Sequence, residues 1–118
     1  MSIPNAPKIC IIGGGISGLT LARVLHKNGI IPTVLERDIS PTTRQQGGSL
    51  DMKRENGQEA LKIAGLYEEF QKKSRKDGQD IKVMMPMGNV IMHHVATEES
   101  DYNPEIDRAH LRGLFLDV

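Results

Sequence analysis

The stretch Lys8-Ile9-Cys10-Ile11-Ile12-Gly13-Gly14-Gly15-Ile16-Ser17-Gly18 decides the fold of this 118-residue chain. Its apolar run, bounded by glycines, is typical of a strand buried on both faces of a parallel sheet. From Ile16 onward apolar residues recur at helical spacing, and Asn28-Gly29 ends this helix. The segment from Pro32 to Glu36 is typical of a second short strand. Residues 8–36 therefore predict a βαβ unit.

Within this unit, Gly13, Gly15 and Gly18 have the spacing of the glycine-rich turn that binds dinucleotides. Gly13 permits a tight turn, Gly15 lets a pyrophosphate approach the backbone, and Gly18 lets the helix pack closely on the strand. The start of the helix offers free N–H groups and partial positive charge to phosphates. Glu36, at the end of the second strand, can accept hydrogen bonds from ribose hydroxyls and disfavours a 2′-phosphate. These residues predict a dinucleotide site without choosing between FAD and NAD. A glycine-rich turn of an unrelated α/β protein is the plainer alternative.

Composition narrows the class of protein. The length is that of one domain, and a single Cys excludes a disulfide-stapled scaffold. Fifteen basic and fifteen acidic residues cancel, and aromatic residues make up only 3%, so we expect no nucleic-acid partner. The N-terminus lacks the features of a secretory signal, and the longest apolar run is far below the ~20 residues of a membrane helix. We therefore expect no membrane partner and a cytoplasmic location.

The remainder of the chain predicts smaller elements. Helices are expected over Glu55–Ala64 and Leu66–Lys73, and a β-hairpin over 81–94, with its turn at Pro86-Met87-Gly88-Asn89. An acidic loop is expected over 96–105. A terminal helix within 107–118 follows, with Asp107 as its cap. The predicted fold class is α/β: a Rossmann-type βαβ segment with a small β-hairpin insertion.

Several side chains outside the glycine turn invite a functional interpretation. His93 and His94 are adjacent in a strand and would point to opposite faces, so we expect no metal site. Core packing is the expected role of Cys10 and of the methionines around the hairpin. The latter are Met84, Met85, Met87 and Met92. The apolar Leu114, Phe115 and Leu116 are expected to be exposed beside an open sheet edge.

Four motifs together resemble the N-terminal part of the group A FAD-dependent monooxygenases, with particular likeness to the tetracycline-inactivating flavin monooxygenases. They are GGGISGLTLARVLHKNGI…VLER, GGSLDM, GQEALKIAGL and NPEIDRAHLR. They occur in the family's order and nearly its spacing, from Lys8 to Leu116. The resemblance implies FAD and NADPH as cofactors. It also implies an NAD(P)H- and O2-dependent oxygenation of an aromatic or polycyclic substrate, with tetracycline-like compounds in that class.

The resemblance also gives roles to single positions. Glu36 resembles the ribose-binding acid of the FAD site, and Arg37 resembles the residue that flanks the adenine. Arg44 lies in the loop where the family has an arginine implicated in NADPH contact. Asp51 resembles the flavin-contacting aspartate, and Arg108 resembles the arginine that holds the ribityl–phosphate part of the flavin. Arg37, Arg44 and Arg108 could instead be solvated surface residues, and Asp51 could be a turn residue. No residue is given a catalytic acid–base role.

Some motifs of the resembled family have no counterpart in the sequence. These are the downstream Gly-Asp motif that completes the flavin site, the substrate sheet and the C-terminal helix. We therefore expect residues 1–118 to form a partial FAD-binding domain, incomplete relative to the full monooxygenase fold and inactive by itself. A non-catalytic FAD-binding fragment and another FAD- or NAD-dependent oxidoreductase remain alternatives.

Overall fold

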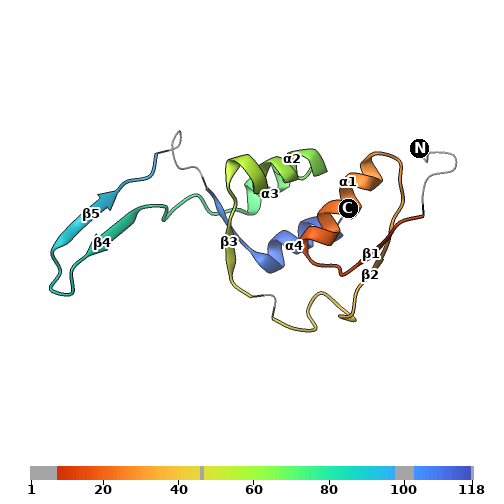
Figure 1. Ribbon diagram of the computed structural model, residues 1–118, viewed down its shortest axis with the longest axis horizontal. Helices are drawn as coiled ribbons and strands as arrows, with labels where there is room; N and C mark the ends of the chain where they lie inside the picture. Colours follow the sequence, from red (N-terminus) through yellow and green to blue (C-terminus); the bar gives the residue numbers. More distant parts are fainter. Residues whose placement is uncertain (1–7, 46, 98–102, 118) are drawn as a thin grey trace.

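The first part of the chain forms the βαβ unit that the sequence predicts (Figure 1). The computed structural model describes residues 8–45, 47–97 and 103–117. Strand β1 (Cys10–Ile12) is followed by helix α1 (Ile16–Lys27) and strand β2 (Thr33–Leu35). The two strands pair in parallel, with Ile11 opposite Val34. A parallel pair requires a crossover connection, which α1 supplies.

Helix α1 has the termini that its sequence predicts. Its first turn contains no acidic residue, while His26 and Lys27 lie in its last turn, where positive charge suits the helix dipole. The helix ends at Lys27 with Asn28 as its C-cap, and Gly29 follows with a positive φ of 78°. Glycine adopts this left-handed conformation without the strain that a side chain would cause. The chain can therefore turn sharply back into β2.

The expectation that the first strand is buried on both faces is wrong. Ile11 is buried, but Ile12 is 81% exposed and Cys10 is exposed as well. Alternate residues of a strand point to opposite faces, and Ile11 faces α1, where its Cγ2 would lie 3.2 Å from a Cβ on Gly18. Cys10 is therefore an exposed thiol and not the buried apolar residue that was expected.

The second part of the chain joins a short sheet to four helical segments. Strand β3 (Ser49–Asp51) pairs antiparallel with strand β6 (Glu105–Asp107). Between them lie the π-helix η1 (Arg54–Gln58) and the helices α2 (Glu59–Ala64) and α3 (Tyr67–Lys73), and α4 (Arg108–Leu116) follows β6. The helix expected over 55–64 is thus divided into a π-helical and an α-helical turn. The loop expected over 96–105 is wrong at Glu105, which begins β6, whereas residues 98–102 lie outside the described residues.

The hydrophobic core lies between α1, α2, α3 and α4. Phe70 and Ile106 are fully buried at its centre, together with Leu61 and Leu111. The expectation that the end of α4 is exposed is wrong for two residues. Leu114 and Phe115 pack into this core, and only the following Leu116 is exposed. Helical spacing places Leu111, Leu114 and Phe115 on one face of α4, which explains their burial.

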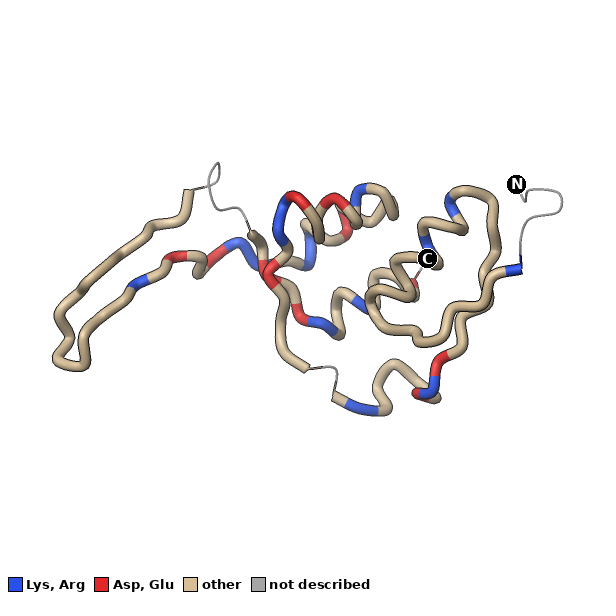
Figure 2. The backbone as a smooth tube through the Cα atoms, viewed as in Figure 1, with Lys and Arg blue, Asp and Glu red and all other residues tan. Residues whose placement is uncertain are grey.

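The β-hairpin of β4 (Ile81–Met84) and β5 (Val90–His94) projects away from the helices (Figure 1). It contains few charged residues, as Figure 2 shows, yet every residue of its two strands is exposed. The core packing expected for its methionines is therefore wrong; Met87, in the turn, is 92% exposed. Within the described residues no second layer covers either face of this two-stranded sheet.

Candidate cofactor-binding site

The three glycines of the turn between β1 and α1 have different environments. Gly13 has a φ of 106°, and its N–H donates to the Leu35 carbonyl oxygen at 2.7 Å, which joins the turn to β2. A Cβ on Gly18 would lie 2.1 Å from the Gly13 oxygen, so helix and turn are too close for any side chain. A Cβ on Gly15 would meet no atom within 4 Å. The space beside Gly15 is therefore open to a ligand.

Helix α1 presents an uncapped N-terminus at this open space. Gly15 is the N-cap residue, and no side chain makes a capping hydrogen bond there. The N–H groups of the first helical turn lack intrahelical partners and carry the positive end of the helix dipole. Open space beside a glycine and unpaired N–H groups together fit a pyrophosphate.

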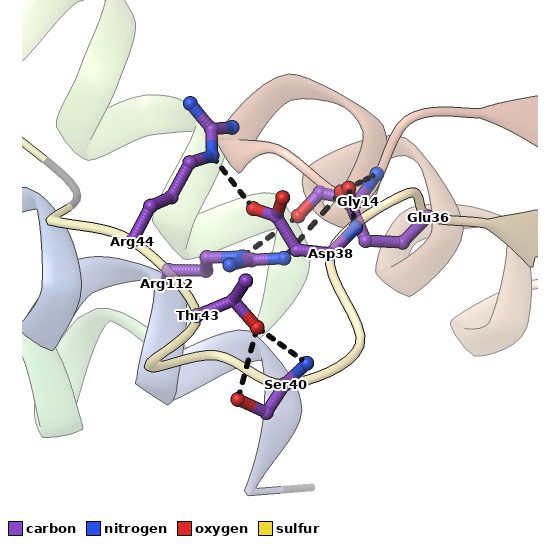
Figure 3. Close-up of polar contacts among 7 residues, drawn as sticks. All are labelled: Gly14, Glu36, Asp38, Ser40, Thr43, Arg44 and Arg112. Atoms are coloured by element: carbon purple, nitrogen blue, oxygen red, sulfur yellow. Dashed lines mark hydrogen bonds and ion pairs between the residues drawn. The ribbon is translucent and has the colours of Figure 1, made fainter.

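Glu36 reaches from the end of β2 to the glycine turn (Figure 3). Its Oε2 accepts the Gly14 N–H at 2.7 Å, and its Oε1 accepts the Asp38 N–H at 2.9 Å. Hydrogen bonds from the Asp38 and Gly14 backbones, with the nearby charge of Arg112, lower the pKa of this carboxyl. The side chain is still 26% exposed. Glu36 is therefore an ionised acceptor at the edge of the turn, where a ribose would lie beside bound phosphates.

Arg112 is a residue of this site that the sequence analysis missed. From α4 its Nε donates to the Gly14 carbonyl oxygen at 2.9 Å, and its Nη2 lies 3.4 Å from Glu36 Oε2. Its side chain is only 8% exposed. The sequence does show that Arg112 follows Arg108 by four residues, and this spacing places both on one helix face, which could have predicted a shared site.

The loop after Glu36 contains Arg37, which was predicted to flank the adenine, and Arg44, which was predicted to contact NADPH. Arg37 is exposed, directly after Glu36. Arg44 Nε donates to Asp38 Oδ2 at 2.7 Å, and this bond raises the pKa of Arg44. The Asp38 side chain is only 6% exposed, so the pair ties the loop together beside the glycine turn (Figure 3).

Arg108 and Asp51 lie at opposite ends of the β3–β6 pair. The Arg108 N–H donates to the Gly48 oxygen at 3.1 Å, and its side chain passes Gly47, where a Cβ would be 3.3 Å from Cδ. Asp51 pairs with Glu105 two residues away from this end and lines a polar cavity of about 280 Å³. The structure thus brings Arg108 onto the same helix as Arg112, but does not bring Asp51 to the glycine turn.

Among the residues described, no cluster of three or more His, Cys, Asp or Glu could hold a metal ion.

Asp107 takes the N-cap position of α4, but its side chain makes no capping bond. It accepts instead from Arg75 Nη2 at 3.0 Å, which lowers the pKa of the Asp107 carboxyl. The described helices are also too short or too polar to cross a membrane.

The fold and this site define a dinucleotide-binding βαβ protein, and known proteins identify the family. A family model for the FAD binding domain matches residues 7–109. The FAD-dependent monooxygenase subE of Metarhizium robertsii is 48% identical over 61 residues, which cover 52% of this chain and 18% of that protein. The chain thus spans less than a fifth of this curated relative.

Solved structures share the fold of this chain. A 2-methyl-3-hydroxypyridine-5-carboxylic acid oxygenase matches 97% of this chain and 29% of its own, with a TM-score of 0.78 and 20% identity. The tetracycline destructase Tet(55) matches 99% of this chain and 28% of its own, with a TM-score of 0.66 and 26% identity. The chain belongs to the FAD binding domain family, and it corresponds to the FAD-binding part of FAD-dependent monooxygenases.

Proposed function

We propose that this chain supplies the FAD site of a monooxygenase that uses NAD(P)H and O2 on an aromatic or polycyclic substrate. The observation that carries the proposal is the uncapped start of α1 beside the open space at Gly15. Backbone N–H groups there can donate to the pyrophosphate, and Glu36 can accept a hydrogen bond from the adenosine ribose. When bound, the flavin would supply the redox and oxygen chemistry.

The remaining charged residues have proposed roles around this centre. Arg108 would hold the ribityl–phosphate part of the flavin, because its guanidinium extends from the first turn of α4 past Gly47. Asp51 would contact the flavin, and Arg37 would flank the adenine. These roles rest on the family resemblance and on exposed positions that a ligand can reach.

The reductant and the substrate class are proposed by likeness. Arg44 would contact NADPH, since it lies in a loop that is tied to the glycine turn through Asp38 and Glu36. The names of the two matched proteins give their substrates as a hydroxypyridine carboxylic acid and tetracycline. Both substrates are cyclic conjugated compounds. We propose a substrate of that broad class for a protein that contains this chain.

Titration of the chain with FAD, followed by flavin fluorescence, tests the proposed function. Replacing Glu36 by arginine should weaken FAD binding about 10- to 100-fold, because a charge-assisted acceptor is lost. A matched control is Glu68→Arg, which makes the same charge change at an exposed position of α3. The control should bind FAD like the parent, and both variants should keep the parent's circular dichroism. Equal FAD affinity of the Glu36 variant and the parent would overturn the assignment of Glu36.

A further inference from the structure

Arg112 is a charged side chain inside an apolar helix face. Its neighbours Leu111, Leu114 and Phe115 are buried in the core, and the Arg112 side chain is 8% exposed. Arginine is almost never buried without a partner, because its charge loses hydration. The contacts of Arg112 should therefore explain why α4 carries a cation at this position.

Arg112 contacts the glycine turn and the carboxylate of Glu36. Nε donates to the Gly14 oxygen at 2.9 Å, and Nη2 lies 3.4 Å from Glu36 Oε2. The same Oε2 accepts the Gly14 N–H at 2.7 Å. Gly14, Glu36 and Arg112 thus form a closed ring of contacts, in which the guanidinium fixes both the turn and the carboxylate (Figure 3).

The third nitrogen of this guanidinium argues against a role in stability alone. Nη1 is buried and has no hydrogen-bond partner among the described residues. A buried donor without a partner destabilises a fold, and a buried ion pair is often no more stabilising than apolar residues of the same size. The benefit of Arg112 should therefore lie in the geometry that it imposes on Glu36.

In that geometry the two carboxylate oxygens of Glu36 have different partners. Oε2 faces Gly14 and Arg112, whereas Oε1 accepts the Asp38 N–H at 2.9 Å and lies away from the guanidinium. A carboxylate oxygen can accept about two hydrogen bonds. Oε1 is thus the oxygen with capacity for a further donor.

We propose that Arg112 is a positioning residue of the FAD site, which holds Glu36 so that its Oε1 accepts a hydroxyl of the adenosine ribose. The proposal rests on the proposed function, because it assumes that the dinucleotide is bound at this turn. Arg112 acts through Glu36 and does not itself contact the ribose. Removing Arg112 should therefore affect ligands with and without that hydroxyl to different extents.

The test compares FAD with analogues that lack the 2′- or the 3′-hydroxyl of the adenosine ribose. The variants are Arg112→Met, Glu36→Gln, their double mutant and Arg112→Lys, and affinity is measured by flavin fluorescence. Arg112→Met should lower FAD affinity about tenfold. It should also remove most of the preference for FAD over the analogue that the parent protein binds more weakly. The double mutant should bind no more weakly than Glu36→Gln, since both changes disable the same acceptor. Arg112→Lys should restore part of the preference.

Arg23 provides a matched control. It is also a partly buried arginine, and its Nε donates to the Ala64 oxygen at 3.3 Å between α1 and α2. Arg23→Met should change the melting temperature but leave the preference for the ribose hydroxyl unchanged. Circular dichroism identifies any variant that fails to fold, in which case Arg112→Lys carries the comparison.

The outcomes separate the two proposals. If the parent binds FAD and prefers it over an analogue, and Arg112→Met keeps that preference, Arg112 has only a structural role and the inference is wrong. Additive losses in the double mutant contradict it as well. If the parent binds no FAD, the proposed function fails and the inference falls with it.

Discussion

Alanine at Gly18 should mainly lower stability and alanine at Gly15 should mainly weaken FAD binding, although the two glycines lie in one turn. At Gly18 a Cβ would be 2.1 Å from the Gly13 oxygen and 3.2 Å from Ile11 Cγ2. Gly13 cannot move away freely, because its N–H is bonded to the Leu35 oxygen at 2.7 Å. At Gly15 the Cβ would meet nothing within 4 Å, and the φ of −76° suits any residue.

The expected magnitudes follow from these contacts. Overpacking costs about 1–3 kcal/mol, and the upper end applies at Gly18, where the clash is with backbone. A helical alanine returns about 1 kcal/mol relative to glycine. Gly18→Ala should therefore lower the free energy of unfolding by about 2 kcal/mol or more, a drop in melting temperature of roughly 8 °C. Gly15→Ala, at the N-cap, should cost about 1 kcal/mol at most but weaken FAD binding about tenfold or more.

The assay is a thermal melt of each variant followed by an FAD titration at a temperature where it is folded. Gly113→Ala in α4 is the control, because its Cβ would also meet nothing within 4 Å. It should raise stability by up to about 1 kcal/mol and leave FAD affinity unchanged. A Gly18→Ala variant as stable as the parent would refute the close packing of helix and turn. Undiminished FAD retention by Gly15→Ala would show that the pyrophosphate lies elsewhere.

Three further predictions concern the core, acid stability and the reductant. Phe70→Ala should lower the free energy of unfolding, measured by urea denaturation, by about 3–5 kcal/mol, because this ring is fully buried. The control Met87→Ala, at a side chain that is 92% exposed, should change it by less than about 0.5 kcal/mol. The pKa of Glu36 is lowered by folding, so its ionised form stabilises the chain at neutral pH, and that contribution is lost as the pH falls through the lowered folded-state pKa. In Glu36→Gln the free energy of unfolding should therefore fall less steeply as the pH is lowered into the acid range. The same pH dependence in variant and parent would contradict this. In a flavin-loaded protein that contains this chain, Arg44→Gln should slow reduction by NADPH and leave FAD affinity within about twofold, as stopped-flow absorbance would show.

The βαβ unit could be predicted because its signals are local. Gly13 and Gly29 mark turns where the backbone needs positive φ, and helical periodicity between them identifies α1. The β3–β6 pair has no such signal. Each strand has three residues, too few for an alternating pattern, and Leu50 pairs with a distant Ile106. Pairing at that separation is decided by tertiary packing and not by local sequence.

Burial was predicted less well than secondary structure. Ile12 and Met87 are apolar, yet both are exposed, because burial requires a second layer that a local sequence does not specify. Phe115 was expected to be exposed and is buried, because α1 and α4 pack together and cover it. Arg112 was missed for the same reason. Its contact with Gly14 spans 98 residues, and only the folded chain shows why a cation lies among apolar neighbours.

Helix α4 links the parts of the candidate site that are far apart in the sequence. Arg108, in its first turn, lies against Gly47, and Arg112, one turn later, binds Gly14 and Glu36. Side chains four residues apart on a helix have Cβ atoms about 6 Å apart, and this spacing is rigid compared with that of loops. On the proposed binding mode, the distance between the contacts to the ribityl–phosphate part and to the adenosine ribose is therefore fixed by one helical turn. The burial of the same helix in the core then couples the stability of the fold to the geometry of both ends of the site.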